Sequence, residues 1–260
     1  MGTSEIILLF GAALLGGLVN SVAGGGGFVA FPALLFTGMP SINANATNTV
    51  ALWPGTLAST GAYRKALSPE LLKRILPLIV ITFLGSIVGS TLLLKTRVST
   101  FDKLVPWLLL GATLLFSFGG KVTAFVNRHH SEGGPSLGRV VRITFLQLCV
   151  AVYIGYFGGG AGIVMLALLS MMGMENIHSM NGLKTLLATC GNAVAVVVFI
   201  FARAVFWPQA LLMVVGSSLG GYAGAWFAQK MDTRTVRFVV IAIGFTMTSY
   251  FFWRVYWRSH

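Results

Sequence analysis

Charged residues are scarce in this chain, and acidic residues are the scarcest of them. Only 9% of the 260 residues are Asp, Glu, Lys or Arg, and just six are acidic. A soluble domain carries about 25% charged residues. Hydrophobic residues make up 56% of this chain, and its mean hydropathy is +0.84. This composition excludes a soluble globular domain.

Long stretches of the chain lack charge altogether. Residues 6–63 and 143–174 are uncharged and exceed one membrane span, which takes about 20 mainly apolar residues. Further uncharged runs, each roughly one span long, are 75–94, 104–120, 185–202, 204–229 and 238–253. The sequence predicts an all-α polytopic membrane protein with about eight transmembrane helices plus two short half-helices. We expect it in the cell membrane (inner or plasma membrane), in contact with the lipid bilayer.

Other absences narrow the function. Cys149 and Cys190 lie in apolar segments without a CxxC or histidine spacing, so we expect two core residues and no disulfide or metal site. His129 and His130, adjacent in a loop, are weak evidence for a metal. No pair of Asp, Glu or His lies within an apolar run to supply acid–base chemistry. We expect no enzyme and no cofactor.

The net charge of +12 has a simple explanation in a membrane protein. Apart from Lys184, the basic residues lie in predicted loops or at helix ends, where Lys and Arg set the orientation in the membrane. Their distribution favours a cytoplasmic N-terminus, and we expect no nucleic-acid partner. The sequence leaves open whether the chain forms a homo-oligomer.

The chain contains an internal repeat. An offset of 135 residues places Gly24, Gly25 and Gly27 on Gly159, Gly160 and Gly162, and it also aligns Gly85 with Gly220, Gly89 with Gly224 and Lys95 with Lys230. Apolar composition alone would not hold glycines and a lysine in register over about 70 residues. We predict repeat 1 at 1–118, a connecting loop at 119–139 and repeat 2 at 140–260.

Each repeat is expected to hold four full helices and one half-helix. The half-helices are 28–38 and 163–173, each about 16 Å long at helical rise, which is half a bilayer. The full helices are 5–22, 46–63, 71–94 and 102–118, then 140–157, 182–202, 207–229 and 236–253. The first of these has no basic flank that would make it a signal peptide. Four crossings per repeat predict halves that run in the same direction, with both termini on one side. If the half-helices also crossed the membrane, the repeats would be inverted, but their short length favours the first alternative.

The glycine run before each half-helix has more than one interpretation. A phosphate-binding loop would require lysine where Phe28 stands, so that interpretation fails. Small residues can simply allow helices to pack closely. Alternatively, interrupted helices at matching positions in two halves indicate a transport site. Half-helices that begin at Phe28 and Ile163 would then point free N–H groups and a positive dipole end at an anion.

A polar patch follows each half-helix. One polar residue suffices to cap a helix, whereas polar groups in lipid are costly and usually functional. Lys184 either snorkels to water or provides a fixed cation for a substrate. The first patch contains Asn43, Asn45, Thr47, Asn48 and Thr49, and the second contains His178, Asn181, Lys184 and Thr185. The predicted substrate-binding residues are Asn20, Gly24, Gly25, Gly26, Gly27, Asn45, Thr47, Asn48, Thr49, Gly159, Gly160, Gly162, Asn181, Gly182, Lys184 and Thr185.

Acidic residues are absent from the predicted spans. Of the six carboxylates, only Glu175, after the second half-helix, could be drawn into the membrane. Without a coupling carboxylate, an anion would move down its electrochemical gradient. A membrane potential that is negative inside drives anions outward.

The glycine runs and patches resemble those of the TauE/SafE family. The segments are GGLVNSVAGGGGFVAFPALLFTG with ATNT, and GYFGGGAGIVMLALLSMMG with NGLK. The resemblance covers nearly the whole chain and implies duplicated four-helix units that export or take up sulfite and organosulfonates. Members often carry Thr-Asn-Lys or Thr-x-Lys in the patch, whereas here only Lys184 matches, which implies a single cation for the substrate.

Together these features predict a secondary transporter that exports a small anionic substrate resembling sulfite or a sulfonate. Two alternatives stay open. The chain could transport another small anion, or it could be a non-transporting membrane protein that binds partners or assembles with them.

Overall fold

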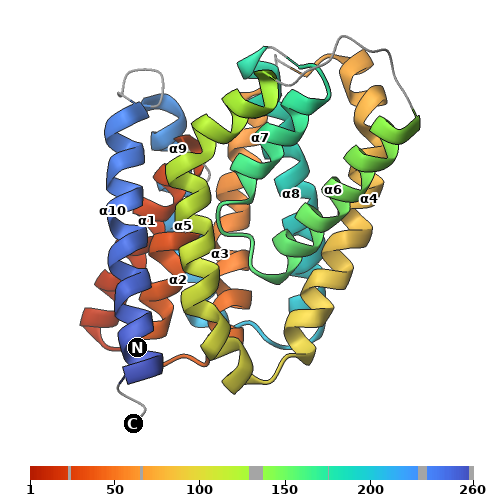
Figure 1. Ribbon diagram of the computed structural model, residues 1–260. Helices are drawn as coiled ribbons and strands as arrows, with labels where there is room; N and C mark the ends of the chain where they lie inside the picture. Colours follow the sequence, from red (N-terminus) through yellow and green to blue (C-terminus); the bar gives the residue numbers. More distant parts are fainter. Residues whose placement is uncertain (23–24, 65–66, 129–136, 175, 228–232, 258–260) are drawn as a thin grey trace.

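The structure is a computed structural model that describes residues 1–22, 25–64, 67–128, 137–174, 176–227 and 233–257 (Figure 1). These residues form long helices and two short ones. The helices are α1 (Thr3–Val22), α2 (Gly27–Phe36), α3 (Ser41–Ala62), α4 (Pro69–Lys95), α5 (Val98–Arg128), α6 (Leu137–Tyr156), α7 (Ala161–Met171), α8 (Ile177–Phe201), α9 (Trp207–Phe227) and α10 (Thr233–Phe252), followed by the π-helical turn η2 (Trp253–Trp257).

Both predicted half-helices are present, as α2 and α7. The predicted helix starts at 46 and 182 are wrong, because α3 begins at Ser41 and α8 at Ile177. Both polar patches therefore lie inside helices. Thr49 shows how a helix accommodates them: its hydroxyl donates to the carbonyl of Asn45 at 2.8 Å, one turn back.

The predicted connecting loop 119–139 is also shorter than expected. Helix α5 continues to Arg128 and α6 begins at Leu137, since a helix end needs no apolar residues once it leaves the membrane. Residues 129–136, which include His129 and His130, lie outside the described residues.

The two halves run in opposite directions, so the prediction of parallel halves is wrong. Successive residues of α1 meet successive residues of α9: Gly216 lies against Phe10, and Gly220 against Leu14. Likewise Gly85 lies against Leu148, and Gly89 against Val152, so α4 and α6 are also parallel. Figure 1 shows α9 rising from the end where α4 finishes. Hence α1 rises with α9, whereas α6 descends with α4.

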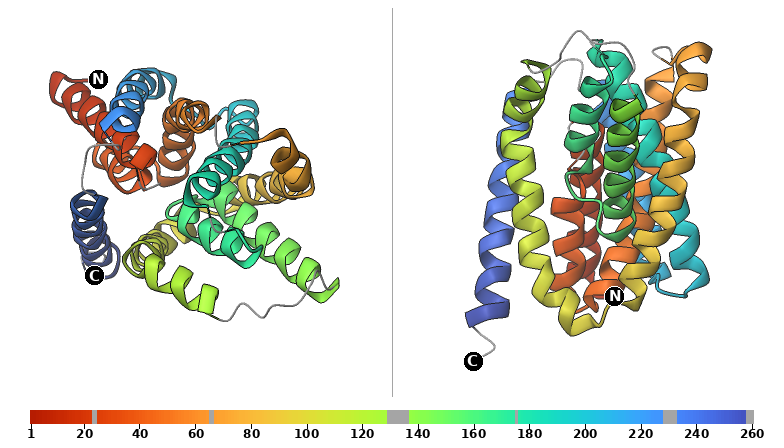
Figure 2. Two further views of the ribbon diagram at one scale, coloured as in Figure 1. Left: turned by 90° about the horizontal axis from the view of Figure 1, so that it is seen from above. Right: turned by 45° about the vertical axis from the view of Figure 1, so that its right-hand side comes forward.

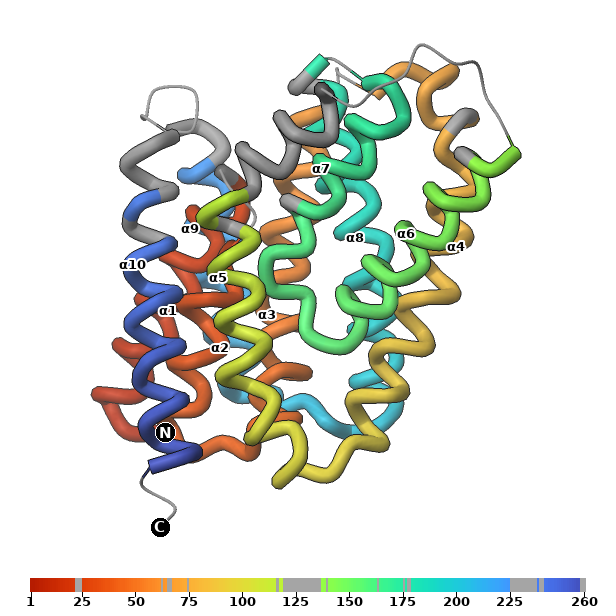
Figure 3. Tube along the Cα trace, in the orientation of Figure 1, coloured from red at the N-terminus to blue at the C-terminus, as the bar shows by residue number. Residues whose placement is uncertain are grey.

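Each half-helix turns back toward the side from which the preceding helix came. Figure 3 shows this for α6 and α7, where the chain reverses at residues 157–160. A helix and its returning half-helix together make no net crossing, which leaves three crossings per half. The start of α1 and the end of α10 still lie at the same end of the bundle (Figure 2). The prediction from the sequence treated the first helix of each half as a separate crossing, and for this reason the predicted relative direction of the two halves was wrong.

Helices of both halves intermix in two packing groups. In the first group, α9 packs against α1 and α3, and α10 packs against α2. In the second, α4 packs against α6 and α8, and α5 packs against α7. The groups meet where α3 contacts α8 and where α5 contacts α10, which is the most extensive contact that α10 makes with another long helix (Figure 2). Each group thus takes its half-helix from one half and its last two helices from the other.

The polarity of the bundle is the reverse of that of a soluble protein. On α4, Leu76, Val80, Leu84 and Val88 are exposed, and they recur at the spacing of one helix face. The opposite face of α4 is buried and carries small and polar residues, namely Thr82, Gly85, Ser86, Gly89 and Ser90. Soluble proteins rarely expose such a continuous apolar face, whereas lipid solvates it. The chain is an integral membrane protein.

The same reversal explains why one sequence prediction about cysteine is wrong. Cys149 is exposed on α6, and Cys190 on α8 is only partly buried. An apolar outer face looks like a core in the sequence, because lipid and core accept the same side chains.

Among the described residues, four helices are long and apolar enough to cross a membrane: Thr3–Ser21, Ile75–Lys95, Val98–Leu115 and Ser179–Phe201. The eight predicted spans are thus only partly confirmed. Helix α3 does not qualify, because its first half carries the polar patch, although it packs inside the bundle against α8 and α9.

Close glycine contacts hold α1 and α9 together, and they give a testable prediction. A Cβ added to Gly220 would lie 1.9 Å from the carbonyl oxygen of Leu14, whereas one added to Gly111 would meet nothing within 4 Å. Gly220→Ala is therefore expected to lower the free energy of unfolding by about 1–3 kcal/mol or more. Thermal unfolding in detergent measures it, with Gly111→Ala as the matched control. Equal midpoints for the two variants would contradict this packing.

Candidate functional site

The first glycine run makes a turn that only glycine can occupy. A Cβ on Gly26 would lie 2.1 Å from the carbonyl oxygen of Gly16 and 3.0 Å from Cβ of Asn20. Asn20 therefore lies beside the turn on α1 and is partly buried. Gly25 is buried as well, and Gly24 lies outside the described residues.

The second glycine run reaches a similar turn by a different backbone conformation. Gly158 and Gly160 have φ of +75° and +73°, in the left-handed region that favours glycine. Between them, the carbonyl of Gly159 accepts a hydrogen bond of 2.6 Å from the hydroxyl of Tyr153. The sequence did not single out Tyr153, because a tyrosine in a helix that also contains Thr144, Gln147 and Tyr156 has no distinguishing signal.

The first-turn N–H groups of α2 are less available than predicted. The N–H of Phe28 donates to the carbonyl of Gly25 at 3.1 Å, and those of Val29 and Ala30 donate to Gly26 at 3.2 Å. In the second half, the N–H of Ala161 donates to Gly158 at 3.4 Å. The expected free N–H at Phe28 is therefore wrong, because the glycines fold back to accept these bonds. The positive dipole end of each half-helix is still present.

The start of each half-helix faces one residue of the next full helix. A Cβ on Gly27 would lie 3.5 Å from Nδ2 of Asn48, and one on Gly162 would lie 3.2 Å from Cδ of Lys184. Asn48 and Lys184 thus occupy equivalent places. The sequence offset instead pairs Lys184 with Thr49, because the second half has one more residue between its half-helix and its next helix.

A small cavity lies between the two packing groups, and we call it the central cavity. It has about 10 Å³ of space for the centre of a water molecule, which is enough for one water. Asn45 and Asn48 supply its polar lining. The other lining residues are Gly27, Phe28, Phe31, Leu109, Phe157 and Gly159. Both glycine runs therefore reach one cavity, with Phe31 and Phe157 in edge-to-face contact at 5.6 Å.

The asparagines of the central cavity are incompletely satisfied. Nδ2 of Asn45 donates to the carbonyl of Tyr156 at 3.0 Å, and this bond joins α3 to α6. The Oδ1 atoms of Asn45 and Asn48 are buried and have no hydrogen-bond partner in the described part of the chain. A buried amide oxygen without a partner costs roughly 1–3 kcal/mol, so these two oxygens favour a water or a ligand that donates to them.

Lys184 does not line the central cavity but lies against Gly162, in the first turn of α7. Its side chain is only 5% exposed, and its Nζ donates to Oδ1 of Asn181 at 3.1 Å. Burial rules out the snorkelling interpretation. Among the described residues, no other charged side chain is buried and no carboxylate pairs with Lys184. It places a buried amine against Gly162 in the first turn of α7.

Several other predicted site residues make hydrogen bonds or packing contacts within and between helices. The hydroxyl of Thr47 accepts from the N–H of Phe206 at 3.1 Å, which ties α3 to the segment before α9. Thr185 donates to the carbonyls of Asn181 and Gly182, within its own helix. Gly182 packs against Leu67 and Tyr63. None of these residues lines the central cavity.

The sequence did not predict the apolar residues that line the central cavity. Phe31, Leu109 and Phe157 are ordinary residues of apolar helices, and no local pattern distinguishes them. Only the packing of α2, α5 and the turn after α6 brings them together.

The sequence matches the model of a known family. The family model described as sulfite exporter TauE/SafE matches residues 9–251. The chain belongs to this family. The resemblance predicted from the glycine runs is confirmed, and it covers both glycine turns, both half-helices and Lys184.

Relatives of the TauE/SafE chain are similar over almost their full length. A protein of Haemophilus influenzae described as "Probable membrane transporter protein" is 28% identical over 259 residues, which is 96% of this chain and 95% of that protein. The "Probable membrane transporter protein YfcA" of Escherichia coli K12 is 28% identical over 93% of this chain and 87% of its own length. The "Probable membrane transporter protein ORF9" of Sinorhizobium sp. is 28% identical over 93% and 90%, respectively. No solved structure is a significant match.

Proposed function

We propose that this TauE/SafE chain is a secondary transporter that exports small sulfur-containing anions such as sulfite or an organosulfonate. The observation that carries the proposal is the placement of the two half-helices. They come from halves that run in opposite directions, they begin at glycine turns beside one central cavity, and one of them begins next to the buried cation of Lys184.

This placement suits an anion near the middle of a membrane. Helix N-termini carry about half a positive elementary charge, and half-helices in inverted repeats of known transporters point such ends at anionic substrate groups. Lys184 adds one full charge. A single cation fits a monovalent anion, or one end of a larger sulfonate, better than a fully ionised divalent anion.

The packing groups supply a way to alternate access. Both groups contribute to the central cavity: α2 and α3 from the first, and α5 and the α6–α7 turn from the second. A rocking motion of one group against the other would open the cavity to one side and then to the other, as inverted repeats allow. In the present state the cavity has room for only about one water, so the substrate requires that motion.

The charge distribution favours export. Lys184 is the only buried charge found in the described helices, and no buried carboxylate accompanies it to couple a proton or sodium ion. An anion then follows its electrochemical gradient, to which the membrane potential adds about 2.3 kcal/mol per charge per 100 mV in the outward direction.

Purified protein provides the direct test. Sulfite is expected to raise the apparent free energy of unfolding by about 2.7 kcal/mol at 100 times its Kd, because it binds the native state alone. Proteoliposomes should lose trapped sulfite faster than protein-free liposomes, and faster still when the potential is set negative inside. Acetate and sulfate serve as comparison anions. Sulfite flux equal to that of empty liposomes would overturn the proposal.

A further inference from the structure

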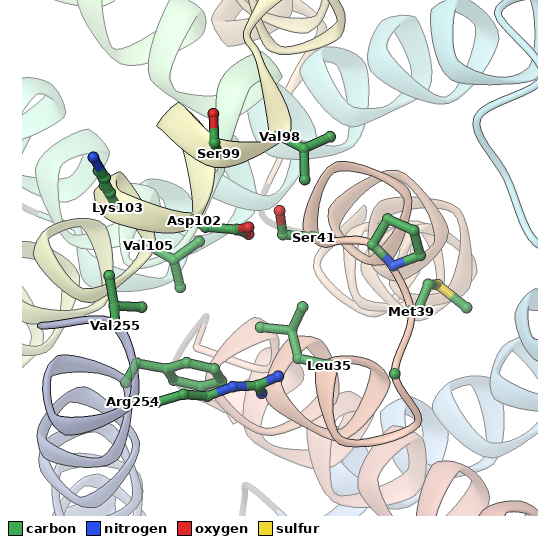
Figure 4. A pocket seen from close by; sticks show the side chains of 13 residues that line it. Leu35, Met39, Ser41, Val98, Ser99, Asp102, Lys103, Val105, Arg254 and Val255 are labelled. Atoms are coloured by element: carbon green, nitrogen blue, oxygen red, sulfur yellow. The ribbon is translucent and has the colours of Figure 1, made fainter. Parts of the chain in front are cut away.

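A second, larger cavity lies at the end of the bundle where α1 begins, and we call it the lower cavity (Figure 4). Its volume is about 390 Å³, within the range of about 300–1,000 Å³ for ligand sites. Its walls are the last turn of α2 with the link to α3, the first turns of α5, and the segment at the end of α10 and η2. It therefore also lies between the two packing groups.

The polar lining of the lower cavity contains an unsatisfied group. Ser41 is 4% exposed, and its Oγ has no hydrogen-bond partner among the described residues. In Figure 4 this oxygen points into the cavity, with Asp102 and Ser99 along the same side, while Arg254 lies on the other side next to Leu35. A buried hydroxyl without a partner favours a ligand or a water at that place.

The positive charge inside the lower cavity comes from Arg254 and from the start of α3. Asp102 contributes one negative charge, and Lys103 lies at the rim, with its ammonium group pointing away from the other lining side chains (Figure 4). Ser41 is the first residue of α3, so the positive dipole end of that helix adds to this charge. A guanidinium binds oxyanions through two parallel hydrogen bonds.

The two cavities lie in line and are separated by one helical turn. On α2, Leu35 lines the lower cavity and Phe31 lines the central cavity. On α5, Val105 lines the lower cavity and Leu109 lines the central cavity. Residues four apart lie on the same face of a helix, about 6 Å apart along its axis. All four side chains are buried. They form a continuous apolar plug between the cavities.

We infer that the lower cavity is the vestibule through which the anion reaches the central cavity from the side where α1 begins, with Ser41 and Arg254 as its binding groups. Leu35 and Val105 are the outer layer of the gate, and Phe31 and Leu109 are the inner layer. The inference rests on the proposed transport function, and it adds a site and a gate that the central cavity does not include.

Alkylation of an introduced cysteine tests the vestibule. In a Cys149→Ser, Cys190→Ala background, Ser41→Cys is treated with iodoacetate or with iodoacetamide, which differ mainly in charge. The reagent is removed before sulfite flux is measured. Alkylation of Ser41→Cys is expected to lower flux at least tenfold, because a thioether adduct then fills the vestibule. Ser4→Cys, exposed at the same end of the bundle, is the control whose alkylation leaves flux unchanged.

The charge of Arg254 is tested in the same system. Arg254→Gln is expected to slow the reaction of Ser41→Cys with iodoacetate by about tenfold relative to iodoacetamide, because a charged cavity raises the local concentration of anions. If Ser41→Cys does not fold, Ser99→Cys lines the same cavity and replaces it.

The gate is tested from inside the plug. Asn48→Cys is expected to react slowly with iodoacetamide, and Leu35→Ala combined with Val105→Ala is expected to raise its rate at least tenfold. Flux that survives complete alkylation of Ser41→Cys would overturn the vestibule while leaving transport intact. Absence of flux in the unmodified protein would overturn the transport function instead. An unchanged rate ratio in Arg254→Gln would exclude anion binding at Arg254.

Discussion

Lys184→Met is expected to reduce sulfite flux by at least about 100-fold, which corresponds to about 2.8 kcal/mol of lost stabilisation of the anion in the membrane. Lys184 is the only buried cation found in the described helices, and it lies against the first turn of α7. Without it, an anion in the central region would face only helix dipoles and amides. Flux into proteoliposomes measures the loss.

The variant should still fold. Methionine has a similar length, and the Lys184 side chain makes one hydrogen bond, to Asn181, which is only partly buried and can bind water instead. Thermal unfolding and gel filtration check this point. Lys95→Met is the control, because Lys95 is exposed at the end of α4. Flux in Lys184→Met equal to that in Lys95→Met would contradict a role for the buried cation.

The equivalence of Asn48 and Lys184 gives a sharper version of this experiment. Lys184→Asn is expected to be inactive, and adding Asn48→Lys is expected to restore measurable flux, because the cation then faces Gly27 in place of Gly162. If the double variant stays inactive although it is folded, the position of the cation matters as well as its presence.

Gly26→Ala is expected to prevent folding and Gly27→Ala is expected to permit it, although the two residues are neighbours. A Cβ on Gly26 would lie 2.1 Å from the backbone of α1, which cannot move without separating α1 from α2. We expect little or no monodisperse protein. A Cβ on Gly27 makes only an ordinary contact of 3.5 Å with Asn48, so we expect this variant to fold.

The second variant should nonetheless lose activity. Gly27 lines a cavity with room for about one water, and an added methyl group takes up that space. Sulfite flux is therefore expected to fall at least tenfold in Gly27→Ala with an unfolding midpoint close to that of the original protein. Gel filtration, thermal unfolding and flux are measured on the same preparation. Normal flux in Gly27→Ala would show that the substrate does not pass this turn.

The sequence predicted most of the local structure for clear physical reasons. Uncharged runs of span length identify membrane helices, because lipid excludes charge whatever the fold. The glycine runs identified the two half-helices, and family membership confirmed the resemblance that they carried. Lys184 stood out by itself, since a lone charge within an apolar run needs an explanation in any membrane protein.

Three features depended on contacts that the sequence does not encode locally. The relative direction of the halves depended on whether the chain, after α1 and again after α6, stays on the far side of the membrane or returns through α2 and α7. The length of a helix cannot distinguish these cases. The 135-residue offset places Lys184 on Thr49, whereas the structure gives it the place of Asn48, because one extra residue between helices shifts the register. The N–H groups of the first turn of α2 proved to be bonded to the glycines before them.

The sequence by itself determined the class of the protein, the approximate positions of its helices, the two glycine runs and the lone lysine within an apolar run, because these follow from charge, hydropathy and the lack of a Cβ. Only the tertiary structure decided which residues share a cavity. Phe31, Leu109 and Phe157 lie far apart in the chain and look like any other apolar residues, yet the packing of α2 against the second group places them around Asn45 and Asn48. Ser41 and Arg254 come together for the same reason, because non-local packing, and no short pattern, brings α3 and the end of α10 to one end of the bundle.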